Sequence, residues 1–216
     1  MTIIIERFNK IKSNIASKNL DYKPNIIAVS KTFSLDLIKP IINAGHIHFG
    51  ENKVQEAYLK WKEQKKLNKN IKLHMLGNLQ SNKAKKAVEI FDFIHSLDNP
   101  KLAEKLSKFE KVNDKRLSYF IQVNIGNESQ KSGVEPKKVK FLYDFCKSLN
   151  LNVIGLMAIP PNDDNTDKYF SEILILNQSL GLKELSLGMS QDYLLALKYN
   201  STYLRIGSAI FGERSK

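Results

Sequence analysis

The 216-residue chain has a length typical of one domain with a single core, so residues 1–216 are expected to form one domain. No apolar run approaches the roughly 20 residues that cross a bilayer, and the apolar stretch near the N-terminus is too brief for a signal peptide. The only cysteine, Cys146, excludes an internal disulfide and a thiolate metal cluster. We therefore expect a cytoplasmic protein without a membrane partner.

The formal net charge of +12 would suit a protein that binds nucleic acid, because clustered Lys and Arg side chains neutralise phosphates. Here the lysines are scattered along polar faces, and no aromatic residues alternate with them to stack on bases. The pattern therefore favours a protein with no specific nucleic-acid partner. A basic RNA-binding barrel is kept as a weaker alternative.

Short apolar or β-branched runs alternate with longer segments of helical period, which predicts parallel strands that are wrapped by helices. An additional helix over residues 3–19 precedes the first strand. Eight strands are expected, at residues 26–30, 46–49, 72–76, 93–97, 119–125, 153–159, 184–187 and 203–206. Seven helices separate them, at residues 35–43, 53–66, 83–89, 100–111, 136–149, 166–180 and 191–198. The fold class is therefore α/β, a single (β/α)8 TIM-type barrel with an extra N-terminal helix.

Reactive groups of such barrels gather where the strands end at their carboxyl termini, because the loops there share one face. Lys31 directly follows the first expected strand, and Gly50, Glu51 and Asn52 follow the second. A lysine held in this apolar mouth would be partly desolvated, which lowers its pKa and favours the neutral amine that attacks aldehydes. Taken alone, Lys31 also fits a solvated lysine at a strand end.

Two further loops carry the residue types of a phosphate site. The segment LSLGMSQD at residues 185–192 places Gly and Ser after the seventh strand and opens a helix. The segment RIGSAIFG at residues 205–212 supplies backbone N–H groups at Gly207 and Ser208 after the eighth strand. Loops seven and eight are the usual phosphate site of this fold. A lysine nucleophile that faces such a site suits pyridoxal phosphate, an aldehyde cofactor with a phosphate arm.

Further segments in the same order, AVSK (28–31), HFGENKVQE (48–56), HMLGNLQSNK (74–83), HSLD (95–98), NESQKSG (127–133) and GLMAIP (155–160), resemble the pyridoxal phosphate homeostasis proteins. That resemblance implies a Schiff base of pyridoxal phosphate on Lys31, Asn52 beside the ring, and Ser190, Gly207 and Ser208 around the phosphate. It also implies that Arg205 approaches the pyridine nitrogen. A permanent cation there opposes protonation of the ring and makes it a poor electron sink.

The resemblance implies a role in vitamin B6 homeostasis, as a buffer or carrier of the cofactor with little or no turnover. Apo-enzymes that require pyridoxal phosphate are possible partners, and a monomer is expected. The fold also looks like the N-terminal barrel of alanine racemases, so a pyridoxal phosphate-dependent amino-acid racemase is the alternative. Racemisation needs acid–base groups on both faces of the reacting carbon, and Tyr193 and Tyr199 are candidates for the second face.

The four histidines give a weak case for a metal site. His46 and His48 share one face of a strand, as in some metal-dependent hydrolases, but His46 is expected to begin the second strand, far from the reactive rim. His74 and His95 are expected to be hydrogen-bonded residues of the core or the bottom of the barrel.

Overall fold

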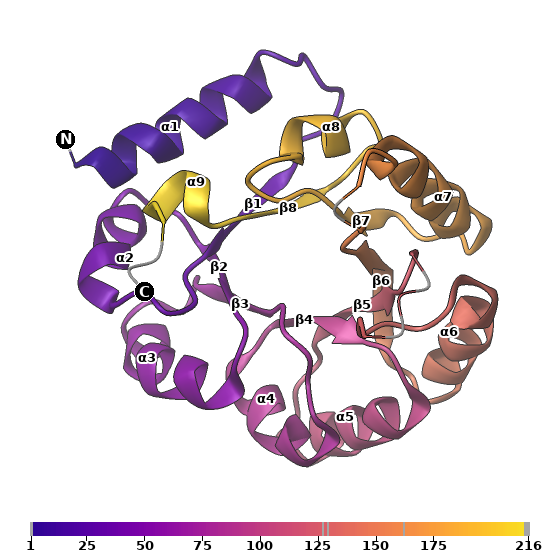
Figure 1. Ribbon diagram of the computed structural model, residues 1–216. Coiled ribbons are helices and arrows are strands. Elements are labelled where there is room, and N and C mark those ends of the chain that lie inside the picture. Colours follow the sequence, from indigo (N-terminus) through magenta and orange to yellow (C-terminus); the bar gives the residue numbers. More distant parts are fainter. Residues whose placement is uncertain (1, 127, 129, 162, 214–216) are drawn as a thin grey trace.

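The computed structural model describes residues 2–126, 128, 130–161 and 163–213. Its parallel strands follow one another around a closed barrel in the order β1 to β8, and β8 pairs with β1 (Figure 1). The eight-stranded parallel barrel predicted from the sequence is therefore confirmed. The strands are β1 Asn25–Val29, β2 His48–Glu51, β3 Lys72–Met75, β4 Phe93–Leu97, β5 Ser118–Val123, β6 Asn152–Ala158, β7 Glu184–Ser186 and β8 Tyr203–Ile206.

Helices surround this barrel, and each expected helix is present (Figure 1). They are α1 Ile3–Ala16, α2 Leu35–Asn43, α3 Val54–Leu67, α4 Ala84–Ile90, α5 Pro100–Asn113, α6 Val139–Ser148, α7 Thr166–Ser179, α8 Tyr193–Leu197 and α9 Ser208–Phe211. Short 3-10 turns precede two of them, η1 Ser81–Lys83 and η2 Pro136–Lys138. The short helix α9, directly after β8, is absent from the sequence-based expectation.

The extra N-terminal helix α1 lies outside the ring of strands, beside α2 and α9 (Figure 1). Its buried residues recur at helical spacing along one face. These residues are Ile4, Phe8, Ile11 and Ile15. Within the described residues, no helix combines the length and the apolar character that a membrane span requires.

Alternation along the strands decides which side chains enter the barrel. On β1, Ile27 and Val29 belong to an inner apolar cluster with Phe120 and Tyr203. The intervening residues Ile26 and Ala28 belong instead to the larger core between the barrel and its helices. The next inward position after Val29 is residue 31, so the strand itself directs Lys31 toward the mouth of the barrel.

The start of β2 differs from the expectation. The strand begins at His48, because the paired register with β3 runs from His48 to Glu51, and His46 lies before it. The His46 Nε2 atom lies 2.9 Å from the backbone oxygen of His48, and its ring packs edge-on against Phe8 of α1. Gly50 and Glu51, expected in the following loop, therefore lie inside the strand.

Candidate functional site

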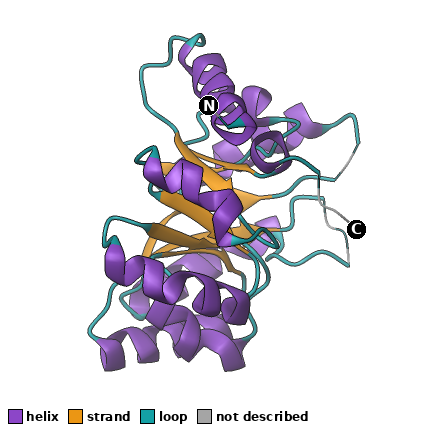
Figure 2. Cartoon of the chain, turned by 90° about the vertical axis from the view of Figure 1, so that its left-hand side faces the viewer, coloured by secondary structure: helices purple, strands orange, loops and turns teal. Residues whose placement is uncertain are grey.

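A cavity of about 730 Å³ opens at the carboxyl ends of the strands. Figure 2 shows the barrel from the side, with its helices around the strands. The lining of the cavity comes from the loops after several strands and from the inward side chains of β1 and β8. All the site residues proposed from the sequence line this one cavity: Lys31, Asn52, Ser190, Arg205, Gly207 and Ser208. The structure thus brings together six residues that are up to 177 positions apart in the chain (208 − 31 = 177).

Hydrogen bonds fix the chain on both sides of Lys31. On one side, Lys60 of α3 donates to the backbone oxygen of Ser30 (2.9 Å). On the other side, the backbone N–H of Thr32 donates to Glu56 Oε1 (2.7 Å), and Thr32 has a φ of 69° in the left-handed region. A non-glycine residue in this conformation is uncommon and needs surrounding contacts to hold it. The backbone that carries Lys31 is therefore held from two directions.

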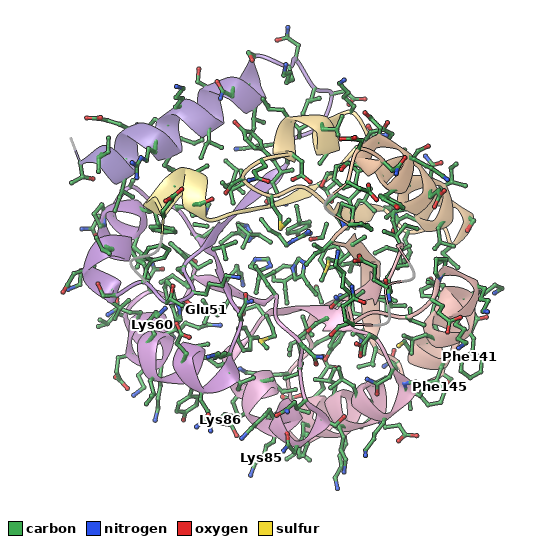
Figure 3. All side chains as sticks on the ribbon, viewed as in Figure 1. Glu51, Lys60, Lys85, Lys86, Phe141 and Phe145 are labelled. Carbon is green, nitrogen blue, oxygen red and sulfur yellow. The ribbon has the colours of Figure 1, made fainter. Side chains whose placement is uncertain are left out.

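These contacts form part of an ion-pair network beneath Lys31, and sequence reasoning missed it. Glu51 is fully buried at the end of β2, and its Oε1 atom accepts from Lys60 (3.0 Å), Trp61 Nε1 (2.9 Å) and Ser30 Oγ (2.8 Å). Figure 3 shows Lys60 and Glu51 side by side. Lys60 also pairs with Glu56 (3.3 Å). We call these residues, Ser30, Glu51, Glu56, Lys60 and Trp61, the Glu51 network.

Asn52 comes directly after β2, and Gly77 after β3 holds the next loop against it. A Cβ atom at Gly77 would lie 2.3 Å from the Asn52 backbone oxygen, closer than non-bonded atoms approach. Only glycine allows this approach of two backbones. Asn52 is thereby fixed at the rim of the cavity.

The two loops predicted to bind a phosphate meet at Ser190. Its Oγ atom accepts from the backbone N–H groups of Gly207 and Ala209, each at 3.2 Å. Gly188, with a φ of 84°, makes the turn that carries Ser190, and a Cβ there would lie 2.7 Å from Ala196. A hydroxyl and the N–H groups of one backbone turn therefore lie together. These groups bond to one another in this structure, and they are the types of donor that bind a phosphate.

Glycine at position 207 also leaves room for a ligand. A Cβ atom there would meet nothing closer than Val29 at 3.4 Å, an ordinary van der Waals distance. Packing of the protein therefore does not demand glycine, and both Gly207 and Val29 line the cavity. The missing side chain keeps this part of the cavity open beside the N–H groups.

Arg205 is a buried cation at the base of the cavity, with only 5% of its surface exposed. Its guanidinium donates to the backbone oxygens of Ser186 (2.5 Å) and Ala158 (2.9 Å) and to Ser186 Oγ (2.8 Å). No ion pair to a carboxylate is formed by Arg205 among the residues that the structure describes. Burial lowers the pKa of Arg205 to about 10, so it stays a cation at neutral pH.

The cavity is also lined by residues that were not predicted from the sequence, among them Lys131 and Asp192. Lys131 forms an ion pair with Glu128 (2.6 Å) and donates to the backbone oxygen of Pro160 (3.2 Å). It belongs to the NESQKSG segment quoted above, but it does not follow a strand end directly. The Asp192 carboxylate accepts from the backbone N–H of Met189 (2.6 Å) and so closes the turn before α8.

The two tyrosines proposed for the second face of a racemase lie elsewhere. The Tyr193 hydroxyl accepts from Asn14 of α1 (3.1 Å), and the Tyr199 hydroxyl donates to Asp167 of α7 (2.6 Å). No tyrosine occurs among the described residues that line the cavity. The geometry therefore does not support Tyr193 or Tyr199 as the second base of a racemase.

His74 and His95 are fully buried and hydrogen-bonded, as expected. The described part of the chain contains no cluster of three or more His, Cys, Asp or Glu residues that could hold a metal ion.

Comparison with known proteins identifies the family. Residues 6–215 match the family model described as alanine racemase, N-terminal domain. The chain is 40% identical to the pyridoxal phosphate homeostasis protein of Vibrio cholerae, with 88% of this chain and 85% of the relative covered. It is 36% identical to that of Pseudomonas aeruginosa, with 99% and 97% covered. The chain belongs to the pyridoxal phosphate homeostasis protein family.

A comparison with solved structures supports the fold. PipY of Synechococcus elongatus, solved with pyridoxal phosphate bound, is 34% identical to this chain with a TM-score of 0.86. The match covers 97% of this chain and 100% of PipY. The chain thus matches PipY over nearly its whole length. The family resemblance predicted from the sequence motifs is confirmed by the relatives of Vibrio cholerae and Pseudomonas aeruginosa.

Proposed function

We propose that this chain, as one domain over residues 1–216, binds pyridoxal phosphate covalently through a Schiff base on Lys31 and acts in vitamin B6 homeostasis as a buffer or carrier. The observation that carries the proposal is the single cavity that Lys31, Arg205, Ser190 and Gly207 line together. Support comes from the relative PipY, which has been solved with pyridoxal phosphate bound. We also propose that the protein is cytoplasmic and monomeric and that it has no specific nucleic-acid partner.

The residues of the cavity fit the chemistry of this cofactor. Pyridoxal phosphate supplies an aldehyde that condenses with an amine, a phosphate arm, and a ring that can withdraw electrons. Lys31 would supply the amine, and Ser190, Gly207 and Ser208, which line the cavity together, would bind the phosphate. The N–H groups of Gly207 and Ala209, which donate to Ser190 Oγ in this structure, belong to the same turn. Asn52 would lie beside the ring. The open space at Gly207 leaves room for the ligand.

Arg205 favours a carrier over a catalyst. It remains a cation at neutral pH, and its guanidinium is held by three hydrogen bonds at the base of the cavity. A fixed positive charge beside the ring nitrogen disfavours protonation of that nitrogen, which weakens the electron withdrawal that amino-acid chemistry requires. The lining also lacks, within its described residues, a tyrosine that could serve as a base on the second face. We therefore propose little or no turnover, with apo-enzymes as possible recipients of the cofactor.

The Lys31→Ala variant tests the covalent attachment. Wild-type protein incubated with pyridoxal phosphate should turn yellow, and borohydride should fix the cofactor on the peptide that contains Lys31. Lys31→Ala should give no fixed label and should bind at least about tenfold more weakly, or about 1.4 kcal/mol. Lys85→Ala, which removes an exposed lysine of α4, serves as the control and should behave as wild type.

A reduced label on Lys131 or on another lysine would overturn the assignment of Lys31. The carrier role is tested separately with a panel of amino acids. An alanine racemisation rate near the roughly 10 s⁻¹ of ordinary enzymes would refute it.

A further inference from the structure

Beneath Arg205, a row of hydrogen-bonded side chains crosses the interior of the barrel. Ser186 Oγ lies 2.9 Å from His95 Nδ1, His95 Nε2 lies 2.9 Å from His74 Nδ1, and His74 Nε2 lies 2.9 Å from His48 Nδ1. Each link joins the δ nitrogen of one ring to the ε nitrogen of the next. We call His48, His74 and His95 the histidine column. Ser186 joins its upper end to Arg205 through a hydrogen bond of 2.8 Å.

The strand register explains why the three rings meet. His48 pairs with Lys72, two residues before His74, and His74 pairs with Phe93, two residues before His95. From β2 to β3 and from β3 to β4, the inward-facing histidine is therefore shifted by two residues toward the carboxyl end of the strand. The three histidines thus run from the bottom of the barrel toward the cavity. His74 stacks on Phe93 and His95 on Phe120, both with ring centroids 4.3 Å apart, which fixes the ring planes.

The hydrogen bonds at the upper end set the direction of all the others. A guanidinium can only donate, so Ser186 Oγ accepts from Arg205. Among the hydrogen bonds of the described residues, the only other partner of this hydroxyl is His95. The hydroxyl proton of Ser186 therefore finds its acceptor in His95 Nδ1. His95 must then carry its proton on Nε2, and the same reasoning applies to His74 and His48. His48 is the last residue of the column, at the bottom of the barrel. It is half-buried and lines a second cavity, of about 670 Å³, beside α1.

The column lies where histidines are held neutral. Burial lowers the pKa of His74 and His95 well below 6.5, and the charge of Arg205 lowers that of His95 further. A neutral imidazole is a dipole, and in this arrangement each lone pair faces the side of Arg205 while each N–H faces away from it. Oriented side-chain dipoles can help to offset the burial of a charge. Here they would add to the Asp192 carboxylate, which also favours the Arg205 cation although it forms no ion pair with it within the described residues. Chains of hydrogen bonds that share one direction also strengthen one another.

We propose that His48, His74 and His95 form an uncharged column with a single hydrogen-bond direction, and that through Ser186 it positions the Arg205 guanidinium for the cofactor ring. This inference rests on the proposed function for the part that concerns the ring. In this assignment Ser186 and His95 are positioning residues, because they contact Arg205 directly or through one hydroxyl and do not line the cavity. The column also accounts for a buried arginine whose described surroundings offer it only neutral acceptors.

The direction of the column is tested on protein without cofactor. Long-range ¹H–¹⁵N spectra of the histidine side chains at pH 7 should show the Nε2–H form for His48, His74 and His95. A charged ring, or an Nδ1–H form, at His74 or His95 would overturn the proposal. This measurement does not depend on cofactor binding, so it stands apart from the proposed function.

The positioning role is tested with Ser186→Ala and a matched control, Ser107→Ala. Ser107 is also a buried serine, but its hydroxyl donates to the Leu149 backbone oxygen, away from the cavity. Ser186→Ala should bind pyridoxal phosphate about three- to tenfold more weakly and shift the visible absorption band, since it removes a hydrogen bond to a charged group. Ser107→Ala should change neither property.

Equal affinity and spectra for Ser186→Ala and Ser107→Ala would refute the positioning role while cofactor binding itself stands. If Ser186→Ala does not fold, Ser186→Cys fills the site with a slightly larger, weakly hydrogen-bonding thiol and should show the same direction of change. Failure of the wild-type protein to bind the cofactor would instead overturn the proposed function together with the positioning role. The direction of the column would then be judged by the spectra of the unloaded protein alone.

Discussion

Replacement of Lys60 by methionine is expected to destabilise the protein by about 3–5 kcal/mol, because it leaves the Glu51 carboxylate buried without its cation. Glu51 is completely buried, and its Oε2 atom has no hydrogen-bond partner in the described part of the chain. The side chain of Lys60 is only 10% exposed, so water cannot replace the ammonium group well. Urea unfolding at pH 7 measures the change in the free energy of unfolding.

Lys66→Met is the matched control on the same helix, α3. Lys66 pairs with Glu63, and both side chains are more than 60% exposed, so loss of this pair should change stability by less than about 1 kcal/mol. The double variant Glu51→Gln/Lys60→Met removes both charges and keeps an oxygen for Ser30 and Trp61, so it should recover much of the loss. Equal stabilities for Lys60→Met and Lys66→Met would show that the buried pair has no special energetic role.

The Glu51 network connects stability to the site. The same Lys60 ammonium that pairs with Glu51 donates to the backbone of Ser30, and the Glu56 carboxylate accepts from the backbone of Thr32. These two backbone groups flank Lys31. A cavity of this size could admit a flexible lysine in many orientations, but the network restricts its backbone to one. The charged residues of α3 therefore contribute to the placement of Lys31 through the backbone of its two neighbours.

The barrel could be predicted from the sequence because its signal is repeated. Each strand is a short apolar run and each long helix has its own period, so an error at one boundary leaves the count unchanged. The start of β2 shows the limit, since the pattern HIHFG does not reveal whether His46 or His48 is the first paired residue. The helix α9 was missed for a related reason, because its four residues span little more than one turn and show no period.

The candidate site was predictable where a residue follows a strand directly. Asn52 and Gly207 satisfy that rule, and Lys31 follows the end of β1 after one residue, Ser30. The motifs around these residues carry the family resemblance. The Glu51 network and the histidine column could not be predicted by that rule. Each consists of side chains from different strands and helices that contact one another only in the folded barrel. Glu51 and Lys60 are nine residues apart on a strand and a helix, and His95 and Ser186 are 91 residues apart. Only the register and the closure of the barrel bring such pairs together.

The histidines also predict that the protein loses stability in weak acid. Burial lowers the pKa of His46 from 6.5 to about 4, and those of His74 and His95 fall well below 6.5. The unfolded chain therefore binds more protons than the folded one as the pH falls below 6.5, so the free energy of unfolding decreases in that range. The surface carboxylates Asp36, Glu63 and Glu135 have lowered pKa values, so their protonation reduces the free energy of unfolding only at lower pH.

Each histidine that stays neutral in the fold contributes at most about 1.4 kcal/mol per pH unit, so His74 and His95 together contribute up to about 3 kcal/mol between pH 6 and pH 5. Glu110 acts in the opposite direction, because burial raises its pKa. Since a domain is typically stable by about 5–15 kcal/mol, this loss should shift urea midpoints markedly. His74→Phe keeps an aromatic ring against Phe93 without a titrating group, and its slope against pH should be shallower by about 1.4 kcal/mol per unit. A free energy of unfolding that stays constant from pH 7 to pH 5 would contradict the neutral state of these buried rings.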